Sequence, residues 1–359
     1  MRQIGLDWPV SSYTGWGVFG LHLCLALVRR GTAAPVLFHP PQLDLTPAQA
    51  RLFEQVRVRE LPAARHVDFP VLHALGNQLC DFGLLSGAGD AGLVFFEDAR
   101  LDREACERAK KYRLIIAGSN WNGELLRQAG IAHVAVAQQG YDESVFYPGL
   151  KAPTWPGRFV IFSGGKLEPR KAQDLVLQAF AEFHVRHPEA LLVTAWHGFS
   201  DQIELDLPRT PDGKPDIAAW AAQYGIPQDA VVDIGFIPNR RMGEVLRACD
   251  AALFPNRCEG GTNLVAMEAL ASGLPTILSS NTGHLDLIET VPCWVLKDQG
   301  PSMQEGWGES SIDECLMHLE EIYADRKKAA ARALGAARVL QENWSWAIRA
   351  AKVAEALGY

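Results

Sequence analysis

Short apolar segments of strand length alternate with amphipathic segments of helix length along the whole chain, and this alternation constrains the fold more than any other feature of the sequence. The pattern is typical of a doubly wound α/β architecture, in which helices cover both faces of a parallel sheet. Strands are expected at residues 3–6, 35–38, 70–73, 93–96, 114–117 and 134–137, and then at 159–163, 191–194, 231–234 and 251–254. The first group alone requires a sheet of at least six strands.

The alternation breaks at residues 147–157, where three prolines and two glycines crowd together. We interpret this segment as a linker. A chain of 359 residues is also too long for one ordinary core. We therefore predict an N-terminal Rossmann-like domain at residues 1–150 and a second one at 151–340. A C-terminal helix at 341–359 is expected to pack back toward the first domain.

Composition and charge exclude several functional classes. The chain has 48% hydrophobic and 21% charged residues, and it lacks both a run of eighteen apolar residues and an apolar signal segment at its start. We therefore expect a cytoplasmic protein. Seven cysteines without metal-type spacing are expected to be reduced thiols, with no zinc site. A formal charge of -8 argues against a nucleic-acid partner.

Residues 100–113 depart locally from this balance, because they hold six basic residues among three acids. They are expected to form a solvated mixed-charge helix; contact with an anionic membrane surface is the alternative. A second open assignment is the segment 201–215, which is either a loop over a ligand or a surface insertion.

Residues 257–276 place two glutamates, Glu259 and Glu268, around a glycine-bearing loop that opens a helix. Thr262 and Asn263 are good N-cap residues, so the free amides of the first helical turn would face a ligand such as a diphosphate. Side chains lean toward a helix N-terminus, so Glu268 could accept hydrogen bonds from a ribose diol there. The candidate donor-binding residues of this segment are Gly261, Thr262, Asn263, Leu264 and Glu268.

A second informative segment, residues 161–171, follows a strand, turns on paired glycines that include Gly165, and enters a helix with Pro169 near its first turn. Lys166 and Lys171 could both reach one anion at the carboxyl edge of the sheet, where α/β enzymes bind ligands. Cations near a helix N-terminus are opposed by the dipole, so a bound phosphate explains them better than an ordinary basic helix start does.

Together these segments resemble the donor half of the family 4 glycosyltransferases of the GT-B fold, whose Gly-Arg-Leu-x-x-x-Lys-Gly and Glu-x7-Glu segments hold a nucleotide-diphosphate sugar. Residues 165–172 match the first segment with Lys166 in place of arginine and Ala172 in place of the final glycine. Residues 119–122 and 139–148 resemble the stretches that precede the family's linker. The resemblance implies two domains facing across a cleft, and retaining, metal-independent transfer without a cofactor.

The chain departs from the family pattern at two places. Eight residues rather than seven separate Glu259 from Glu268, and glycines at 260 and 261 make an extra residue sterically easy. Where many relatives carry a histidine at the end of an N-domain strand, this chain has Glu97, followed by Asp98. His73, at the end of the preceding strand, is expected either to take that role or to be structural.

Gly15 and Gly17, after the first strand, resemble the family's glycine-rich N-terminal loop, which approaches the donor phosphates. No acid follows the next strand, which disfavours an NAD site. Trp8 and Trp16 could stack on sugar faces, with packing as the alternative. The acceptor-side candidates are Trp16, His73 and Asp98.

The sequence therefore predicts a glycosyltransferase that moves a sugar from a nucleotide-diphosphate sugar to a hydroxyl of a glycan, lipid-linked or protein acceptor. Lys171 would stabilise the leaving phosphate. Glu259 would orient the sugar, and Glu97 is the N-domain catalytic candidate. A nucleotide-sugar 2-epimerase, a two-lobed solute-binding protein and an inactive nucleotide-sugar-binding homologue are the alternatives.

Overall fold

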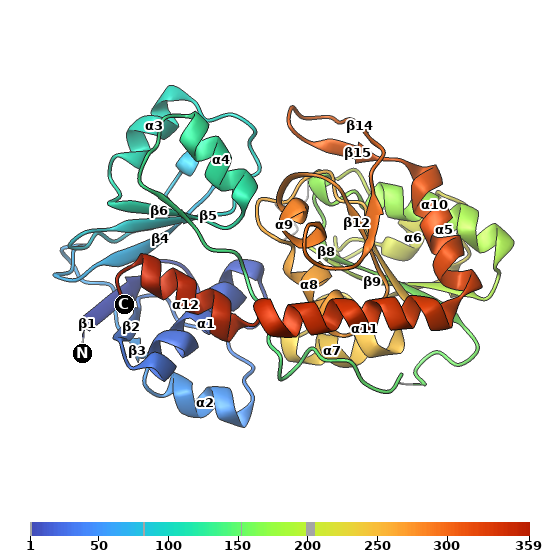
Figure 1. The fold of residues 1–359 in the computed structure, drawn as a ribbon, viewed down its shortest axis with the longest axis horizontal. Coiled ribbons are helices and arrows are strands. Elements are labelled where there is room, and N and C mark those ends of the chain that lie inside the picture. Colours follow the sequence, from blue (N-terminus) through green and yellow to red (C-terminus); the bar gives the residue numbers. More distant parts are fainter. Residues whose placement is uncertain (1, 82, 152, 199–204) are drawn as a thin grey trace.

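A computed structural model describes residues 2–81, 83–151, 153–198 and 205–359. Two parallel β-sheets, each flanked by helices, form two domains that lie side by side (Figure 1). The first sheet has seven strands in the order β3-β2-β1-β4-β5-β6-β7, and the second has six in the order β10-β9-β8-β11-β12-β13. The two-domain α/β architecture is confirmed. In each sheet the strand order reverses beside the first strand, which is where α/β proteins bind ligands.

The strands of the first sheet are β1 (Arg2–Leu6), β2 (Ala33–Leu37), β3 (Arg57–Val58), β4 (Val71–Leu75), β5 (Ala91–Val94), β6 (Leu114–Ala117) and β7 (Val134–Val136). Those of the second are β8 (Phe159–Lys166), β9 (Ala190–His197), β10 (Val231–Asp233), β11 (Ala251–Phe254), β12 (Thr276–Ser279) and β13 (Trp294–Leu296). A separate antiparallel hairpin consists of β14 (Gln299–Pro301) and β15 (Gly308–Ser310).

The helices of the N-terminal domain are α1 (Gly15–Arg30), α2 (Pro47–Phe53), α3 (Arg103–Ala109) and α4 (Asn120–Gln128), with the 3₁₀ turn η1 (Asn77–Leu79). The second domain contains α5 (Gln173–Arg186), α6 (Ile217–Ala222), α7 (Asn239–Ala248), α8 (Leu264–Ala271), α9 (Leu285–Ile288), α10 (Ile312–Ala324) and α11 (Arg326–Asn343), with the turns η2 (Pro169–Lys171), η3 (Gln228–Ala230) and η4 (Thr282–His284). The last helix is α12 (Trp346–Ala356). In the described part of the chain no helix is both long and apolar enough to span a bilayer.

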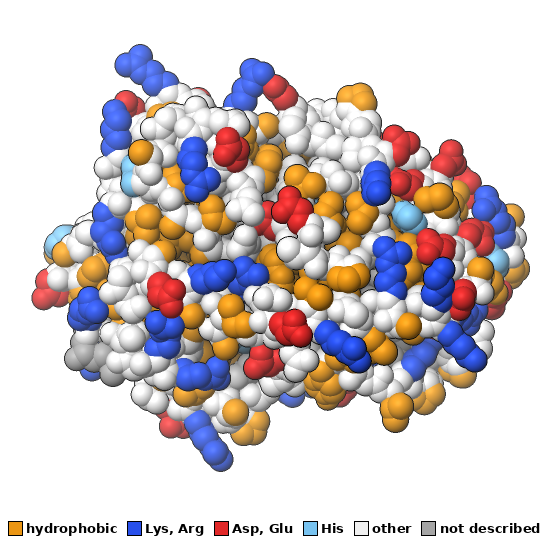
Figure 2. Space-filling model, in the orientation of Figure 1, with side chains coloured by type: hydrophobic (Ala, Val, Ile, Leu, Met, Phe, Trp, Pro, Cys, Tyr) orange, Lys and Arg blue, Asp and Glu red, His pale blue; other side chains and the backbone are white. Residues whose placement is uncertain are grey.

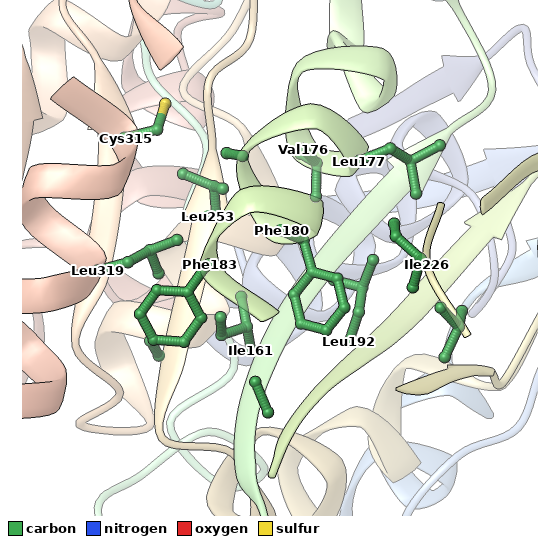
Figure 3. Close-up of a cluster of buried hydrophobic side chains, with 14 of the residues drawn as sticks. Ile161, Val176, Leu177, Phe180, Phe183, Leu192, Ile226, Leu253, Cys315 and Leu319 are labelled. Carbon is green, nitrogen blue, oxygen red and sulfur yellow. The ribbon is translucent and has the colours of Figure 1, made fainter. Parts of the chain in front are cut away.

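Helix α5 supplies much of the core of the second domain. Its apolar residues recur at spacings of three and four, so one face is continuous. Val176, Phe180 and Phe183 on this face are fully buried. They lie between strand residues such as Ile161 and the α10 residue Leu319 (Figure 3). This packing fixes the start of α5. It thereby also fixes the cationic segment, residues 166–171, which precedes the helix.

Helix α1 begins at Gly15. The side chain of Thr14 caps it by accepting a hydrogen bond from the backbone N–H of Gly17 at 3.2 Å. The glycines expected in a loop therefore lie in the first helical turn. The helix ends at Gly31, whose φ of 65° closes it in the left-handed region.

Strand β8 also differs from expectation, because it does not turn at its paired glycines. It pairs with β9 through Gly164, Gly165 and Lys166, and the chain turns only afterwards, at η2. Helices α10 and α11 are separated at Asp325, whose side chain accepts from the backbone N–H of Lys328 at 3.0 Å and starts α11.

The chain crosses between the domains at two adjacent places. The first is the segment between β7 and β8, and the second is the junction of α11 and α12 (Figure 1). The backbone N–H of Tyr141 donates to the carbonyl of Trp344 at 3.1 Å, and that of Trp346 donates to the carbonyl of Tyr141 at 3.0 Å. Both tryptophans are buried, and α12 packs against α1 in the core of the N-terminal domain.

Helix α3 carries the charged segment singled out in the sequence. Its residues form ion pairs between Arg108 and Glu104 at 3.4 Å and between Lys110 and Glu107 at 2.7 Å. On the face shown in Figure 2, basic and acidic side chains are interspersed. These pairs agree with a mixed-charge helix. Residues 201–204 of the segment at 201–215 lie outside the described residues.

Candidate functional site

The loop between β11 and α8 carries Glu259 to the start of α8. Asn263 caps the helix with a φ of 62°, and its side chain accepts from the backbone N–H of Ala266 at 3.3 Å. Gly260 passes close to the other domain, where an added Cβ would lie 2.2 Å from the carbonyl oxygen of Phe95. Only glycine fits this approach, so the lengthened loop is accommodated by pressing its backbone against the N-terminal domain.

Glu259 is buried and paired with two cations. Its carboxylate lies 2.5 Å from Nζ of Lys171 and 3.2 Å from Nη1 of Arg170. The side chain of Asn256 also donates to it, and its backbone N–H donates to Oγ1 of Thr282 at 2.8 Å. Burial disfavours the charged form, but the charges of Lys171 and Arg170 prevail and lower the pKa of Glu259 to about 2. The carboxylate is therefore ionised at neutral pH.

The cationic segment lies against this glutamate. The stem of Lys171 passes over Gly165, where an added Cβ would lie 3.6 Å from Cδ of the lysine. Lys166 is 43% exposed, and its Nζ lies 3.6 Å from the carboxylate of Glu168. The two lysines thus pair with different carboxylates instead of converging on one point. Ala172, at the position of the family's glycine, has a φ of 54°.

Arg170 joins carboxylates from both domains. Its guanidinium lies 3.3 Å from Glu97 of the N-terminal domain, 2.5 Å from Glu168 and 3.2 Å from Glu259. Burial raises the pKa of Glu97 although Arg170 opposes this shift. The interdomain charge cluster consists of Glu97, Lys166, Glu168, Arg170, Lys171 and Glu259. Its three cations balance its three carboxylates.

Glu268 lies on α8 and is 4% exposed. It accepts a hydrogen bond from Nδ2 of Asn239 at 2.6 Å. Burial raises the pKa of Glu268 to about 8, against the opposing effect of this hydrogen bond. A buried carboxyl with one donor retains capacity to accept further hydrogen bonds, as a ribose diol would require.

This shift predicts a pH dependence of stability. Because the folded-state pKa of Glu268 is raised above its ordinary 4.5, its stabilising contribution is complete below that value and is lost as the pH rises through about 8. We expect the melting temperature of the wild type, relative to Glu268→Gln, to fall between about pH 5 and about pH 8.5. Thermal melts of both proteins at both pH values would measure this, and a constant difference would contradict it.

The start of α1 faces the start of α8. An added Cβ at Gly15 would lie 3.8 Å from Cδ1 of Leu264, which places the two helix N-termini next to each other. At Gly17 an added Cβ would lie 2.1 Å from Oγ of Ser11, so this glycine allows the preceding loop to fold onto the helix. The first turn of α1, which contains both predicted glycines, thus lies on the side of the domain that meets the loop between β11 and α8. We call this loop, residues 255–263, the donor loop.

The two tryptophans near this loop pack against each other. Nε1 of Trp8 donates to the carbonyl of Trp16 at 3.0 Å, and Trp8 is 4% exposed within the core. Trp16 is partly buried and meets the ring of Phe95 edge-on at 4.8 Å. Trp8 is therefore a packing residue.

Side chains of the N-terminal domain hold the donor loop directly. Oε1 of Gln139 accepts from the backbone N–H of Thr262 at 3.1 Å, and Oγ of Ser119 donates to the carbonyl of Gly260 at 2.7 Å. Gly261 leaves room for this contact, since an added Cβ would lie 2.6 Å from Oε1 of Gln139. The amide of Thr262 can bind a phosphate only if Gln139 releases it.

The remaining acceptor-side candidates contact other groups. Asp98 accepts from Nε2 of Gln78 at 2.7 Å. His73 is 2% exposed, and its ring nitrogens lie 3.4 to 3.5 Å from three aspartates. Burial opposes protonation of His73, but these carboxylates, Asp7, Asp81 and Asp90, raise its pKa to about 11. The structure places this imidazolium within the N-terminal domain, where it neutralises a cluster of acids.

His73→Gln is expected to lower the free energy of unfolding by about 2 kcal/mol near neutral pH, because it leaves the three acids without their cation. The folded-state pKa of about 11 exceeds the ordinary 6.5, so the contribution is complete below 6.5 and declines as the pH rises toward 11. Denaturant titrations at about pH 7 and about pH 10 should show the difference from wild type shrinking. Equal differences at both values would refute this assignment.

Several residues of the site lack a strong sequence signal. Asn239 begins α7, and nothing local in the sequence marks it as the partner of Glu268. Arg257 is 4% exposed and forms ion pairs with Asp174 and Glu309. Its position two residues before Glu259 is the sequence feature that indicates a role in this site. Among the described residues, no group of three or more His, Cys, Asp or Glu is arranged to hold a metal ion.

The arrangement is suited to electrostatic stabilisation of an anion. Lys171 and Arg170 lie beside the N-terminus of α8 and can exchange a carboxylate partner for phosphate oxygens. Glu259 and Glu97 can accept hydrogen bonds from hydroxyl groups.

Comparison with known proteins identifies relatives. The family model described as glycosyl transferases group 1 matches residues 151–299. A GDP-mannose-dependent alpha-(1-6)-phosphatidylinositol monomannoside mannosyltransferase of Mycolicibacterium smegmatis is 25% identical over 206 residues, covering 56% of this chain and 48% of the relative. A D-inositol 3-phosphate glycosyltransferase of Rhodococcus jostii is 27% identical over 251 residues, covering 66% and 50%. The chain spans about half the length of these relatives.

Solved structures share the whole fold. Anabaena HepE in complex with UDP and glucose superimposes with a TM-score of 0.67 at 17% identity, covering 100% of this chain and 99% of that one. Sucrose-phosphate synthase from Thermosynechococcus elongatus gives a TM-score of 0.71 at 15% identity, covering 100% and 98%. These likenesses show a common fold of two parallel-sheet α/β domains, as in GT-B glycosyltransferases. Residues 151–299, which the family model described as glycosyl transferases group 1 matches, contain the Lys171–Glu259 pair and the capped start of α8.

Proposed function

We propose that the protein transfers a sugar from a nucleotide-diphosphate sugar to an acceptor hydroxyl. The observation that carries this proposal is the interdomain charge cluster, in which Lys171 and Arg170 hold Glu259 at the start of α8 while Glu97 approaches from the other domain. Cleavage of the glycosidic bond leaves negative charge on the departing diphosphate. Lys171 and Arg170 would stabilise that charge, as preorganised cations do in transfer reactions.

The remaining groups have complementary roles in this proposal. Glu259, released from its cations by the diphosphate, would accept hydrogen bonds from sugar hydroxyls and orient the anomeric carbon. Glu268 would accept those of the ribose. We also propose that the transfer retains the anomeric configuration and needs no divalent metal, which the resemblance to family 4 supports. Acceptors are proposed to be glycan, lipid-linked or protein hydroxyls, and the mannoside and inositol phosphate in the relatives' names support a hydroxyl-bearing acceptor.

A thermal-shift panel of UDP, GDP, ADP and dTDP sugars tests the proposal. A ligand that binds only the folded state stabilises it by about 2.7 kcal/mol at a hundredfold excess over Kd. We expect one nucleotide class to raise the melting temperature of the wild type. The same ligand should raise the melting temperature of Lys171→Ala far less. The absence of a shift with every donor would contradict the proposed function.

A nucleotide-sugar 2-epimerase is the second candidate, because Glu97 and Glu259 lie on the same guanidinium and two carboxylates could serve as acid and base. NMR of the donor incubated with the enzyme distinguishes the two reactions. Inversion at C2 without an acceptor would favour epimerisation. Transfer to an added acceptor with C2 unchanged would favour the glycosyltransferase.

A further inference from the structure

The hairpin β14–β15 extends from the second domain to the N-terminal domain. Nε1 of Trp307, at the end of its connecting loop, donates to the carbonyl oxygen of Glu97 at 2.9 Å. Glu305 in the same loop pairs with Arg100, and an added Cβ at Gly306 would lie 2.3 Å from Cβ of Ala99. The loop thus follows the chain immediately after β5.

The base of the hairpin is fixed to the donor loop through Arg257. Its guanidinium binds Glu309 of β15 at 2.5 and 2.8 Å and Asp174 of α5 at 2.7 and 2.8 Å. Its carbonyl accepts from the backbone N–H of Gly308 at 3.0 Å. Arg257 lies two residues before Glu259, so its contacts tie the hairpin and the start of α5 to the loop that carries Glu259.

Contacts from both domains, including a weak one from Sγ of Cys258 to the carbonyl of Glu97 at 3.8 Å, determine where the carboxylate of Glu97 lies. Its backbone N–H donates to Oδ1 of Asn77 at 2.9 Å within its own domain. Its carbonyl accepts from Trp307, and its carboxylate lies 3.3 Å from Nε of Arg170. The last two contacts come from the other domain. They exist only when the domains have closed on each other, and Trp307 acts on the backbone, so it constrains the side chain without touching it.

We propose that Trp307 is a positioning residue, which sets the carboxylate of Glu97 against Arg170 in the interdomain charge cluster when the two domains are closed. This inference rests on the proposed function, because it assigns Trp307 to the same site. The hairpin loop then makes the position of an N-domain carboxylate depend on the donor-binding domain. Loss of the indole N–H leaves the carbonyl of Glu97 without this donor and allows the segment to shift.

A double-mutant cycle tests the assignment, with Trp307→Phe removing the N–H and keeping an aromatic ring. Trp307→Phe is expected to lower kcat about tenfold with little change in donor KM. This corresponds to a loss of about 1.4 kcal/mol of transition-state stabilisation. Combined with Glu97→Gln it should add nothing to the loss caused by Glu97→Gln alone. Glu305→Ala, which removes an exposed contact of the same loop, is the matched control and should retain wild-type kcat. Multiplicative losses in the double variant, or an equal loss in Glu305→Ala, would overturn the proposal.

Amide hydrogen exchange gives a readout that needs no activity. Peptides covering residues 95–99 should exchange faster in Trp307→Phe than in the wild type and in Glu305→Ala, with the rest of the N-terminal domain unchanged. Unchanged exchange in this segment would overturn the positioning role even if the wild type is an active transferase. If no nucleotide sugar binds the wild type, the proposed function fails, and the exchange comparison alone decides whether Trp307 orders Glu97.

Discussion

Lys171→Ala is expected to lower kcat by about 100-fold or more. The ammonium lies 2.5 Å from Glu259 and beside the start of α8, where the leaving diphosphate would develop charge. Removal of one preorganised group of this kind eliminates stabilisation that exists only in the transition state. Initial rates of sugar transfer and of donor hydrolysis measure the effect. Circular dichroism should show an unchanged fold, because the lysine lies in the turn η2, which the core packing of α5 anchors.

Lys166→Ala is the matched control for this variant. Lys166 is 43% exposed and pairs with Glu168 instead of Glu259, so solvent screens its charge. Its loss should reduce kcat by about tenfold or less. Near-normal turnover in Lys171→Ala, or a larger loss in Lys166→Ala than in Lys171→Ala, would refute the assignment of Lys171 to the leaving group.

Arg257→Ala is expected to cause the largest loss of stability among the variants considered, about 3 kcal/mol in the free energy of unfolding. The guanidinium is 4% exposed and satisfies two carboxylates and the carbonyl of Pro169. Removing it leaves Asp174 and Glu309 facing each other without a cation. Urea titration measures the change, and nucleotide binding should weaken at the same time, because the cationic segment and the donor loop lose their common anchor.

Arg186→Ala in the same domain controls for the general effect of removing an arginine. Arg186 is 52% exposed and pairs with Glu320 at 3.2 Å, a surface contact worth less than about 0.5 kcal/mol. Equal losses in the two variants would show that Arg257 has no special role in joining these segments.

The sequence predicts this fold well where hydrophobic periodicity is strong. The strand at residues 114–117 and the buried face of α5 follow directly from it. It failed where tertiary contacts override local signals. β3 has two exposed residues and is a strand only because it pairs with β2. Gly164 and Gly165 suggest a turn, but hydrogen bonding to β9 keeps them extended.

Residues of the candidate site are likewise predictable where a local pattern marks them and not where a tertiary contact does. Lys171 and Glu259 were identified because their segments carry recognisable spacings, and the structure brings them into contact. The partnership of Arg170 with Glu97 joins residues more than seventy positions apart in different domains, and no local pattern encodes such a contact. The hairpin that carries Trp307 is not predicted either, since its strands are three residues long and, within the described residues, pair with each other alone.

The paired crossings at Tyr141 and at the junction of α11 and α12 determine how the two domains can move. One flexible connection would let a domain swing and slide in any direction. Two connections that are hydrogen-bonded side by side restrict this motion, and we expect it to be mainly a rotation about an axis near Tyr141. Opening the contact between Glu97 and Arg170 about this axis would also separate other interdomain hydrogen bonds, among them those of Thr262 with Gln139 and of the backbone N–H of Asn239 with the carbonyl of Ser12. We therefore expect the two domains to open chiefly by this rotation when substrates enter and leave the interdomain site.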